Sequence, residues 1–233
     1  MIIMRTGNIT DIFFDLDHTL WDFDRNSRLA FHRIFNQYGI TINMDEFIEI
    51  YEPINFQYWK LYREERIDKL GLRRGRFLDA FQSFSIRFTM EEVDALAGSY
   101  IDELPKDNHL LTGTIDVLTY LSERKYKLHI ITNGFEEVQY LKLRNSNIDN
   151  YFDTVTTAEE VGVKKPNRLV FERALQKANA TPAKSVMIGD TFEADILGAE
   201  AVGMQTLFYN YRNENPPTDY RMINDIPEIK NFF

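Results

Sequence analysis

The chain has 233 residues, of which 44% are hydrophobic, so it is long enough for one large domain or for a core domain with a smaller inserted one. Its formal net charge of −9 repels nucleic acid backbones and anionic membranes, which argues against binding to a nucleic acid polymer. Because the sequence contains no cysteine, disulfides, thiol nucleophiles and cysteine-ligated zinc are excluded.

The start of the chain and its hydropathy favour a cytoplasmic protein. Residues 1–7 have neither the apolar stretch nor the cleavage pattern of a signal peptide. No apolar run is long enough to span a bilayer, so we expect no association with membranes. The four histidines, His18, His32, His109 and His129, show no metal-ligand spacing.

The first predicted element is a short buried strand over residues 12–14, which runs straight into two carboxylates. Asp15 and Asp17 are two residues apart, so both side chains lean to the same face while the chain stays extended. Two like charges this close call for a cation, and an oxygen-only site suits Mg²⁺ better than zinc. A solvated loop is the alternative, since Asp-x-Asp is common at turns.

The next segment, residues 24–104, has apolar residues at helical spacing and no convincing buried strand. We predict an inserted all-α cap domain of four or five helices over residues 23–104, between the two parts of a core domain, 1–22 and 105–233. Breaks are expected at Gly39, at Pro53, at Gly71 with Gly75, and at Thr89, which has the capping-box form with Glu92.

Beyond Pro105 the pattern changes to an alternation of helices and strands. Helices are predicted over residues 112–124, 135–147, 168–178 and 192–202, and strands over residues 127–133, 154–157, 185–190 and 205–209. Such alternation is typical of parallel strands with right-handed crossovers, hence a three-layer, Rossmann-like, doubly wound α/β core. A polar loop follows over residues 210–219, and residues 223–233 are expected to pack on the core.

Small polar or charged residues follow several of these strands, and the carboxyl ends of parallel strands meet at one crevice. They are Asp15 and Asp17, Thr132 and Asn133, Asp190, and a basic segment that contains Lys165. Together they suit a phosphoryl group that is held between Mg²⁺ and a lysine and is attacked by a carboxylate.

Each of these pieces alone has a plainer interpretation. Thr132-Asn133-Gly134 has the form of a turn, and Lys165 that of an exposed lysine. Asp190 with Thr191 has the form of a helix N-cap, with Asp195 stabilising the first turn. Their coincidence in one chain is harder to explain in this way.

As an ordered set, four segments resemble the motifs of the haloacid dehalogenase-like (HAD) hydrolase superfamily. They are Asp15-Leu16-Asp17-His18-Thr19, Ile131-Thr132-Asn133-Gly134, Lys165-Pro166, and Gly189-Asp190-Thr191 followed by Asp195. The helical insert sits where the superfamily's all-helical C1 cap sits. Further details over residues 132–135, 159–167 and 188–198 resemble the YjjG/YfnB-type branch, which includes pyrimidine nucleoside 5′-monophosphatases.

The resemblance implies a Mg²⁺-dependent phosphomonoester hydrolase with an aspartyl-phosphate intermediate. Asp15 would be the nucleophile, and Asp17 would protonate the leaving alcohol and then activate water, with its backbone carbonyl on the metal. Thr132 and Asn133 would hold phosphate oxygens, and Lys165 would neutralise charge on nucleophile and phosphate. Asp190 would complete the metal site of Asp15 and Asp17, supported by Asp195. We give His18 a structural or loop-positioning role.

The resemblance also implies a small phosphorylated metabolite as partner, first of all a nucleoside 5′-monophosphate, and a monomer or homodimer. Phosphoglycolate or a sugar phosphate is the alternative substrate, and a non-catalytic regulatory protein of the same fold is the alternative function. Dehalogenases of the superfamily lack the second aspartate of the first motif, so Asp17 argues against them.

Substrate selection is assigned to the cap, which is rich in aromatic residues and arginines. Most of the aromatic side chains must form its core. Trp21, Phe23 and Trp59 are candidates for stacking on a nucleobase. Arg74 and Arg76 lie in a predicted turn over residues 72–76, which Gly75 would let bend toward the active site; a solvated basic turn is the alternative.

Overall fold

The computed structural model describes residues 9–217 and 219–233, so the expectation about residues 1–7 lies outside the described part. None of the described helices is both long and apolar enough to cross a membrane. By its internal contacts the chain divides into two compact units. One, the cap, is Asp24–Asp107; the other, the core, combines the described residues up to Phe23 with Asn108–Phe233.

The core is built on one sheet, in which the described residues form six parallel strands in the order β3-β2-β1-β4-β5-β6. The strands are β1 (Asp11–Phe14), β2 (Lys127–Thr132), β3 (Thr154–Thr157), β4 (Ser185–Gly189), β5 (Gln205–Tyr209) and β6 (Met222–Ile223). The central strands β1 and β4 are buried along their whole length, as their continuous apolar runs predict. The chain winds outward from β1 in both directions, which confirms the doubly wound α/β prediction and puts the topological switch point at β1 and β4.

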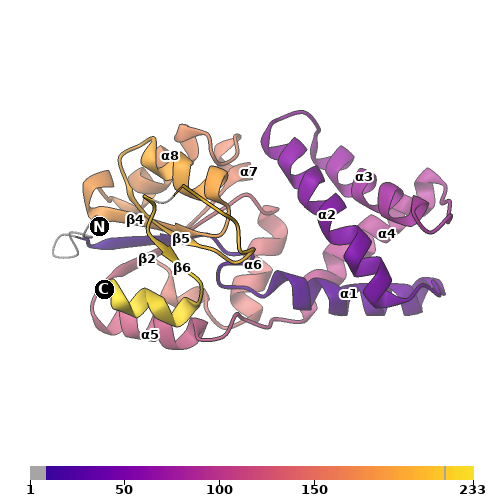
Figure 1. Ribbon diagram of the computed structural model, residues 1–233, viewed down its shortest axis with the longest axis horizontal. Helices are drawn as coiled ribbons and strands as arrows, with labels where there is room; N and C mark the ends of the chain where they lie inside the picture. Colours follow the sequence, from indigo (N-terminus) through magenta and orange to yellow (C-terminus); the bar gives the residue numbers. More distant parts are fainter. Residues whose placement is uncertain (1–8, 218) are drawn as a thin grey trace. The chain divides into compact units, whose positions relative to one another are not determined.

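Helices cover both faces of the sheet, with α8 on one and α5 on the other (Figure 1). The helices of the core are α5 (Thr114–Glu123), α6 (Glu136–Asn145), α7 (Ala158–Val161), α8 (Arg168–Ala178) and α9 (Gly198–Glu200), with short 3₁₀ turns η3 (Asp149–Tyr151), η4 (Pro182–Lys184) and η6 (Ile226–Asn231). On the α8 face, Phe13 and Met187 of the sheet pack with Val170 and Phe171. The predicted return of the C-terminus is confirmed, since η6 packs on α5.

The single helix predicted over residues 192–202 is wrong in form. The chain instead makes a π-helix, η5 (Phe192–Leu197), followed by the short α9. A π-helix is wider than an α-helix and frequently occurs at functional sites. Here it carries Asp195, one of the candidate site residues.

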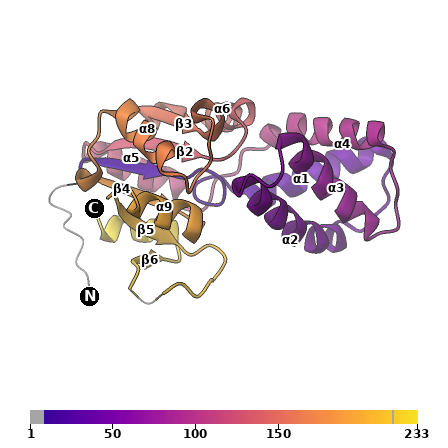
Figure 2. The same ribbon diagram turned by 90° about the horizontal axis from the view of Figure 1, so that it is seen from above.

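The cap helices, which Figure 2 shows, are α1 (Phe23–Tyr38), α2 (Met44–Arg63), α3 (Lys69–Gln82) and α4 (Met90–Glu103). A 3₁₀ turn, η2 (Leu104–Lys106), follows α4. Its core is aromatic, as predicted. The Phe31 ring lies 4.7 to 5.9 Å from four others, those of Phe47, Tyr51, Phe77 and Tyr100. The break at Gly39 and the capping box of Thr89 and Glu92 are confirmed.

Two predicted breaks in the cap are wrong, because tertiary packing overrides local preference. Pro53 lies inside α2. An interior proline costs about 3 kcal/mol relative to alanine, but α2 buries Phe47 and Tyr51 before Pro53 and Tyr62 after it.

The second wrong break is the one predicted at Gly71 with Gly75, because both glycines lie inside α3, as does the turn predicted over residues 72–76. The N-cap Asp68 starts this helix by accepting the N–H of Gly71. Gly75 is needed for close packing rather than for a bend, because a Cβ at that position would overlap the ring of Tyr58.

Candidate active site

Lys165 lies at the centre of the candidate site. Its ammonium donates hydrogen bonds to Asp15 Oδ1 at 2.6 Å, to Asp195 Oδ1 at 2.7 Å and to the carbonyl of Ile131 at 2.7 Å. The residue is only 2% exposed, which rules out the interpretation as an exposed lysine. Burial lowers the pKa of Lys165, but Asp15 and Asp195 more than offset this effect. The pKa of Lys165 is therefore raised, which keeps its side chain positively charged.

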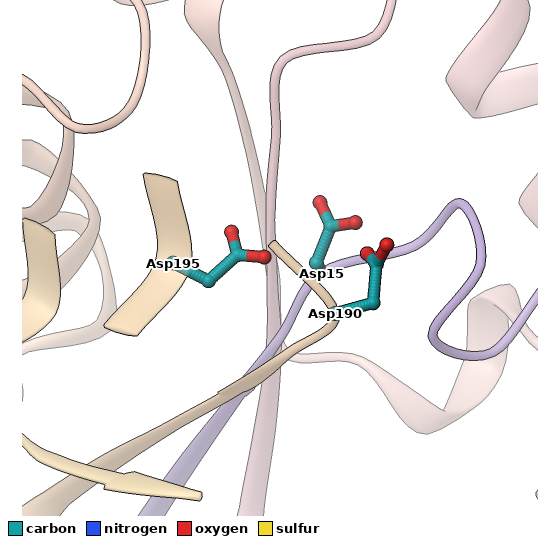
Figure 3. Close-up of side chains that lie close together, drawn as sticks. All are labelled: Asp15, Asp190 and Asp195. Atoms are coloured by element: carbon teal, nitrogen blue, oxygen red, sulfur yellow. The ribbon is translucent and has the colours of Figure 1, made fainter. Parts of the chain in front are cut away.

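Asp15, Asp190 and Asp195 form a buried carboxylate cluster (Figure 3). They come from the end of β1, the end of β4 and the π-helix η5, and one oxygen of each lies within 4.8 Å of the others. Burial raises the pKa of Asp15 well above its ordinary value, and Asp195 and Asp190 raise it further, while Lys165 acts in the opposite direction. Burial likewise raises the pKa of Asp195, again against Lys165. Lys165 alone therefore does not offset the burial of these carboxyl groups and the repulsion among them.

This cluster fits Mg²⁺. All of its donors are carboxylate oxygens, which hard divalent cations prefer, and a bound cation would relieve the repulsion among them. Asp195 is itself well anchored, because its Oδ1 accepts a hydrogen bond from Lys165 at 2.7 Å and its Oδ2 accepts the backbone N–H of Thr191 at 2.9 Å. The predicted ligand set of Asp15, Asp17 and Asp190 stays a prediction.

Asp190 and Asp195 are held in place by their neighbours. Gly189 makes room for Asp195, because a Cβ on Gly189 would overlap that side chain. Asp190 accepts a hydrogen bond from the hydroxyl of Thr19 at 3.3 Å and forms an ion pair with Arg212. The sequence interpretation missed Arg212, because nothing in a polar loop marks one arginine as close to a strand end.

The two polar side chains of the segment Ile131-Thr132-Asn133-Gly134 make different contacts. The hydroxyl of Thr132 accepts the N–H of Gly134 at 3.0 Å. The amide of Asn133 donates to the carbonyl of Lys165 at 3.0 Å and accepts the N–H of Lys165 at 2.8 Å. Asn133 thus clamps the segment that carries the lysine, and its predicted contact with phosphate stays a prediction.

The carboxylate of Asp17 points to helix α6. Its Oδ1 accepts a hydrogen bond from Lys142 at 2.5 Å, and its Oδ2 accepts one from the amide of Gln139 at 3.1 Å. The sequence interpretation missed both residues. A signal was present, because the helical spacing of Val138 and Leu143 places Gln139 and Lys142 on the same inward face of α6.

The loop after β1 turns tightly between Asp17 and α1. The carbonyl of Leu16 accepts the N–H groups of Thr19, Leu20 and Trp21. His18 adopts a positive φ of 60°, and its ring lies 4.9 Å from that of Phe23 and 5.2 Å from that of Tyr211. These contacts support the predicted loop-positioning role of His18.

The candidates for substrate selection differ in exposure. Trp21 is fully buried, whereas Trp59 is half-buried with its ring 5.8 Å from that of Tyr62. Arg74 forms an ion pair with Asp94 at 2.5 Å. Arg76 is 1% exposed, donates to Asn55 at 3.0 Å and lies over the ring of Tyr100. Contact of these four residues with a substrate stays a prediction.

Comparisons with known proteins agree with this geometry. The family model of haloacid dehalogenase-like hydrolases matches residues 12–209. The chain is 34% identical over 207 residues to the pyrimidine 5′-nucleotidase YjjG of Escherichia coli (strain K12), covering 88% of each chain. It is 30% identical over 233 residues to a glyceraldehyde 3-phosphate phosphatase of Methanothermobacter thermautotrophicus, covering 94% of this chain and 97% of the relative. The magnesium-bound HAD-hydrolase YfnB from Bacillus subtilis has the same fold, with a TM-score of 0.87, 24% identity and coverage of 96% and 98%.

Proposed function

The chain belongs to the haloacid dehalogenase-like hydrolase family, and we propose that it is a Mg²⁺-dependent phosphatase of nucleoside 5′-monophosphates. The observation that best supports this type of reaction is the buried contact of Lys165 with Asp15, which belongs to a cluster of three carboxylates. Phosphomonoester hydrolysis is also the activity of its named relatives, which it matches over most of its length.

The reaction begins with Asp15. One of its carboxylate oxygens attacks the phosphorus, the ester P–O bond breaks, and the leaving oxygen takes a proton from Asp17. A water molecule then attacks the phosphoenzyme and gives a proton to Asp17, and the bond between phosphorus and Asp15 breaks. Lys165 holds Asp15 at 2.6 Å and reduces the repulsion between that carboxylate and the phosphate dianion.

Mg²⁺, held by Asp15 and Asp190 with the backbone carbonyl of Asp17, would supply charge stabilisation for the nucleophile and the phosphoryl oxygens. The remaining groups come from the protein. Thr132 donates its hydroxyl proton to a phosphate oxygen, and Asn133 fixes the backbone of Lys165. Asp195 holds Lys165 by accepting a hydrogen bond from its ammonium at 2.7 Å.

A nucleotide is the first choice of substrate because the chain shares 34% of its residues with a pyrimidine 5′-nucleotidase over 88% of both chains. A sugar phosphate is the second candidate, favoured by the 30% identity to a glyceraldehyde 3-phosphate phosphatase. Asp17 argues against dehalogenation, since a halide leaves without a proton. We further propose that the protein is cytoplasmic, acts on small molecules only and is a monomer or homodimer.

Release of phosphate from a panel of metabolites tests this proposal. The panel contains pyrimidine and purine nucleoside 5′-monophosphates, sugar phosphates, glyceraldehyde 3-phosphate and phosphoglycolate, each with Mg²⁺ and with EDTA. We expect the fastest turnover with pyrimidine nucleotides and none in EDTA. Turnover of sugar phosphates alone would favour the second candidate. Absence of turnover throughout the panel would favour the non-catalytic alternative.

A further inference from the structure

Two polar side chains of α6, Gln139 and Lys142, are buried against Asp17. Gln139 is 0% exposed and Lys142 2%. A helix on a protein core normally turns its apolar residues inward, and lysine is almost never fully buried without a partner. Their burial therefore points to a task beyond packing.

The amide of Gln139 joins two residues of the proposed reaction. Its Nε2 donates to the hydroxyl of Thr132 at 2.7 Å and to Asp17 Oδ2 at 3.1 Å. With the amide reversed, its oxygen would face the carboxylate of Asp17 and be repelled, so the nitrogen must face Asp17. The amide oxygen is buried and has no hydrogen-bond partner among the residues that the structure describes. A buried oxygen without a hydrogen bond lowers the stability of the fold. The contribution of Gln139 to the site therefore comes from the two hydrogen bonds that its nitrogen donates.

The same contact orients Thr132. Its hydroxyl oxygen accepts one hydrogen bond from Gly134 and one from Gln139, so its own proton is the group left to donate. Gly134 makes this arrangement possible, because a Cβ there would overlap the amide of Gln139. The Nε2 atom of Gln139 thus determines where the hydroxyl proton of Thr132 can point and how far Thr132 lies from Asp17.

Lys142 holds the other oxygen of Asp17. Its ammonium lies 2.5 Å from Asp17 Oδ1, 4.2 Å from the ring centre of Trp21 and 5.3 Å from that of Phe23. Aromatic faces attract a cation, so the two rings fix the lysine in front of Asp17. This contact also gives Trp21 a structural task in the core that does not involve a nucleobase.

We propose that Gln139 and Lys142 are positioning residues for the proton transfers of the phosphatase reaction. They hold the carboxyl group of Asp17 beside the hydroxyl of Thr132, so that both reach one phosphoryl group. Asp17 can then give its proton to the leaving oxygen as the ester P–O bond breaks, and later take one from the attacking water. This inference rests on the proposed function, since it assigns these residues to the same reaction.

The dependence of rate on the leaving group tests this proposal. p-Nitrophenolate leaves readily without a proton, whereas phenolate needs one, and the two esters are otherwise similar in shape. The variants are Gln139→Met and Lys142→Met, which keep an unbranched side chain of similar length. Arg144→Met is the matched control, because it removes a charge from the exposed side of the same helix. Lys142→Arg, which keeps the charge, tests for rescue.

We expect Gln139→Met and Lys142→Met to lower kcat/KM for phenyl phosphate about tenfold or more beyond their effect on p-nitrophenyl phosphate, a part of the 10²- to 10⁴-fold that general acid–base catalysis supplies. With p-nitrophenyl phosphate they should give a burst of nitrophenol followed by slow turnover, because hydrolysis of the phosphoenzyme still needs Asp17. Arg144→Met should behave like the wild type, and Lys142→Arg should recover part of the loss.

Equal losses on the two esters without a burst would overturn the positioning role and leave a structural one, as would wild-type kinetics in both variants. If one variant does not fold, as judged by circular dichroism, the other decides the question alone. The assay of the wild type distinguishes failure of the proposed function from failure of the positioning role. No turnover of either ester by the wild type would overturn the proposed function together with the positioning role.

Discussion

In the proposed reaction Asp15 meets two opposing demands, because it has to be ionised to attack phosphorus yet is buried beside Asp190 and Asp195. Burial raises its pKa first of all, and the neighbouring carboxylates add to this effect. A carboxyl group whose pKa is raised by folding destabilises the folded protein at every pH above its unfolded pKa of about 4. The penalty is absent below that pH and grows as the pH rises toward the folded pKa.

We therefore predict that Asp15→Asn raises the Tm of the metal-free protein at neutral pH. The shift should be about 2–4 °C for each kcal/mol of penalty removed, and it should shrink as the pH falls toward 4. Differential scanning calorimetry in EDTA measures it. Added Mg²⁺ should raise the Tm of the wild type more than that of the variant. A lower Tm of the variant in EDTA at neutral pH would show that the ion pair of Asp15 with Lys165 outweighs the burial penalty.

The two tryptophans should respond differently to replacement by alanine. If Trp59 stacks on a nucleobase, Trp59→Ala should lower the specificity constant for a nucleotide by about 1 to 3 kcal/mol and leave p-nitrophenyl phosphate unaffected. Trp21→Ala should slow both substrates and lower the Tm, because Trp21 is fully buried against Lys142. Kinetics of both variants on both substrates check this. Parallel losses at Trp59 would assign that residue to the cap core.

Among single residues, the sequence was informative for those that belong to one of the four segments that resemble family motifs. Asp15, Lys165 and Asp195 are brought together as expected, with Asp190 beside them. Gln139, Lys142 and Arg212 were missed. Their tasks depend on which side chain lies opposite them in the fold, and a helix or loop position does not reveal that.

Among the elements, helix α3 of the cap shows how one glycine can be required for packing. A Cβ on Gly75 would overlap the ring of Tyr58 in α2, whereas one on Gly98 in α4 would have no atom within 4 Å. Both glycines lie inside helices, so the two positions form a matched pair.

We predict opposite effects for alanine at these two positions. Gly75→Ala should destabilise the cap by about 1–3 kcal/mol through overpacking. Gly98→Ala should stabilise it by up to about 1 kcal/mol through helix propensity. Urea unfolding measures this, followed by tryptophan fluorescence in a Trp21→Phe background, so that Trp59 alone reports on the cap. Equal effects of the two substitutions would mean that Tyr58 moves aside without loss.

The elements were predicted best where the chain has a short run of β-forming residues. The strand β3 and the strand β5 have the predicted bounds, because short runs of β-formers between turn residues are unambiguous. Pro53 and Gly75 misled the prediction, since both are local helix breakers whose effect is outweighed by contacts between helices. The two-residue strand β6 was missed because it is too short to show a pattern.

In the molecule as a whole, the parallel sheet determines where the candidate site residues lie. β1 and β4 are neighbours, so Asp15 and Asp190 follow adjacent strands at the switch point of the sheet. Lys165 reaches the same point from the chain that follows β3 and α7.

We predict that Mg²⁺ is required and that Ca²⁺ inhibits. Ca²⁺ binds the same type of oxygen but prefers longer bonds and more ligands. It can therefore bind both oxygens of Asp15, which leaves none to attack phosphorus. Steady-state rates with Mg²⁺ and increasing Ca²⁺ check this, with Mn²⁺ as a control for divalent charge. Full activity in Ca²⁺ alone would contradict it.

The measurement closest to the central claim is the detection of a phosphoryl group on Asp15. Asp17→Asn is mixed with p-nitrophenyl phosphate and Mg²⁺, quenched in acid and analysed by peptide mass spectrometry. We expect one phosphoryl group on the peptide that contains Asp15, and none in Asp15→Asn or in EDTA, because Asp17 is needed to hydrolyse the intermediate and Asp15 to form it. An unmodified Asp15 in the Asp17→Asn protein, together with steady turnover by Asp15→Asn, would contradict the mechanism.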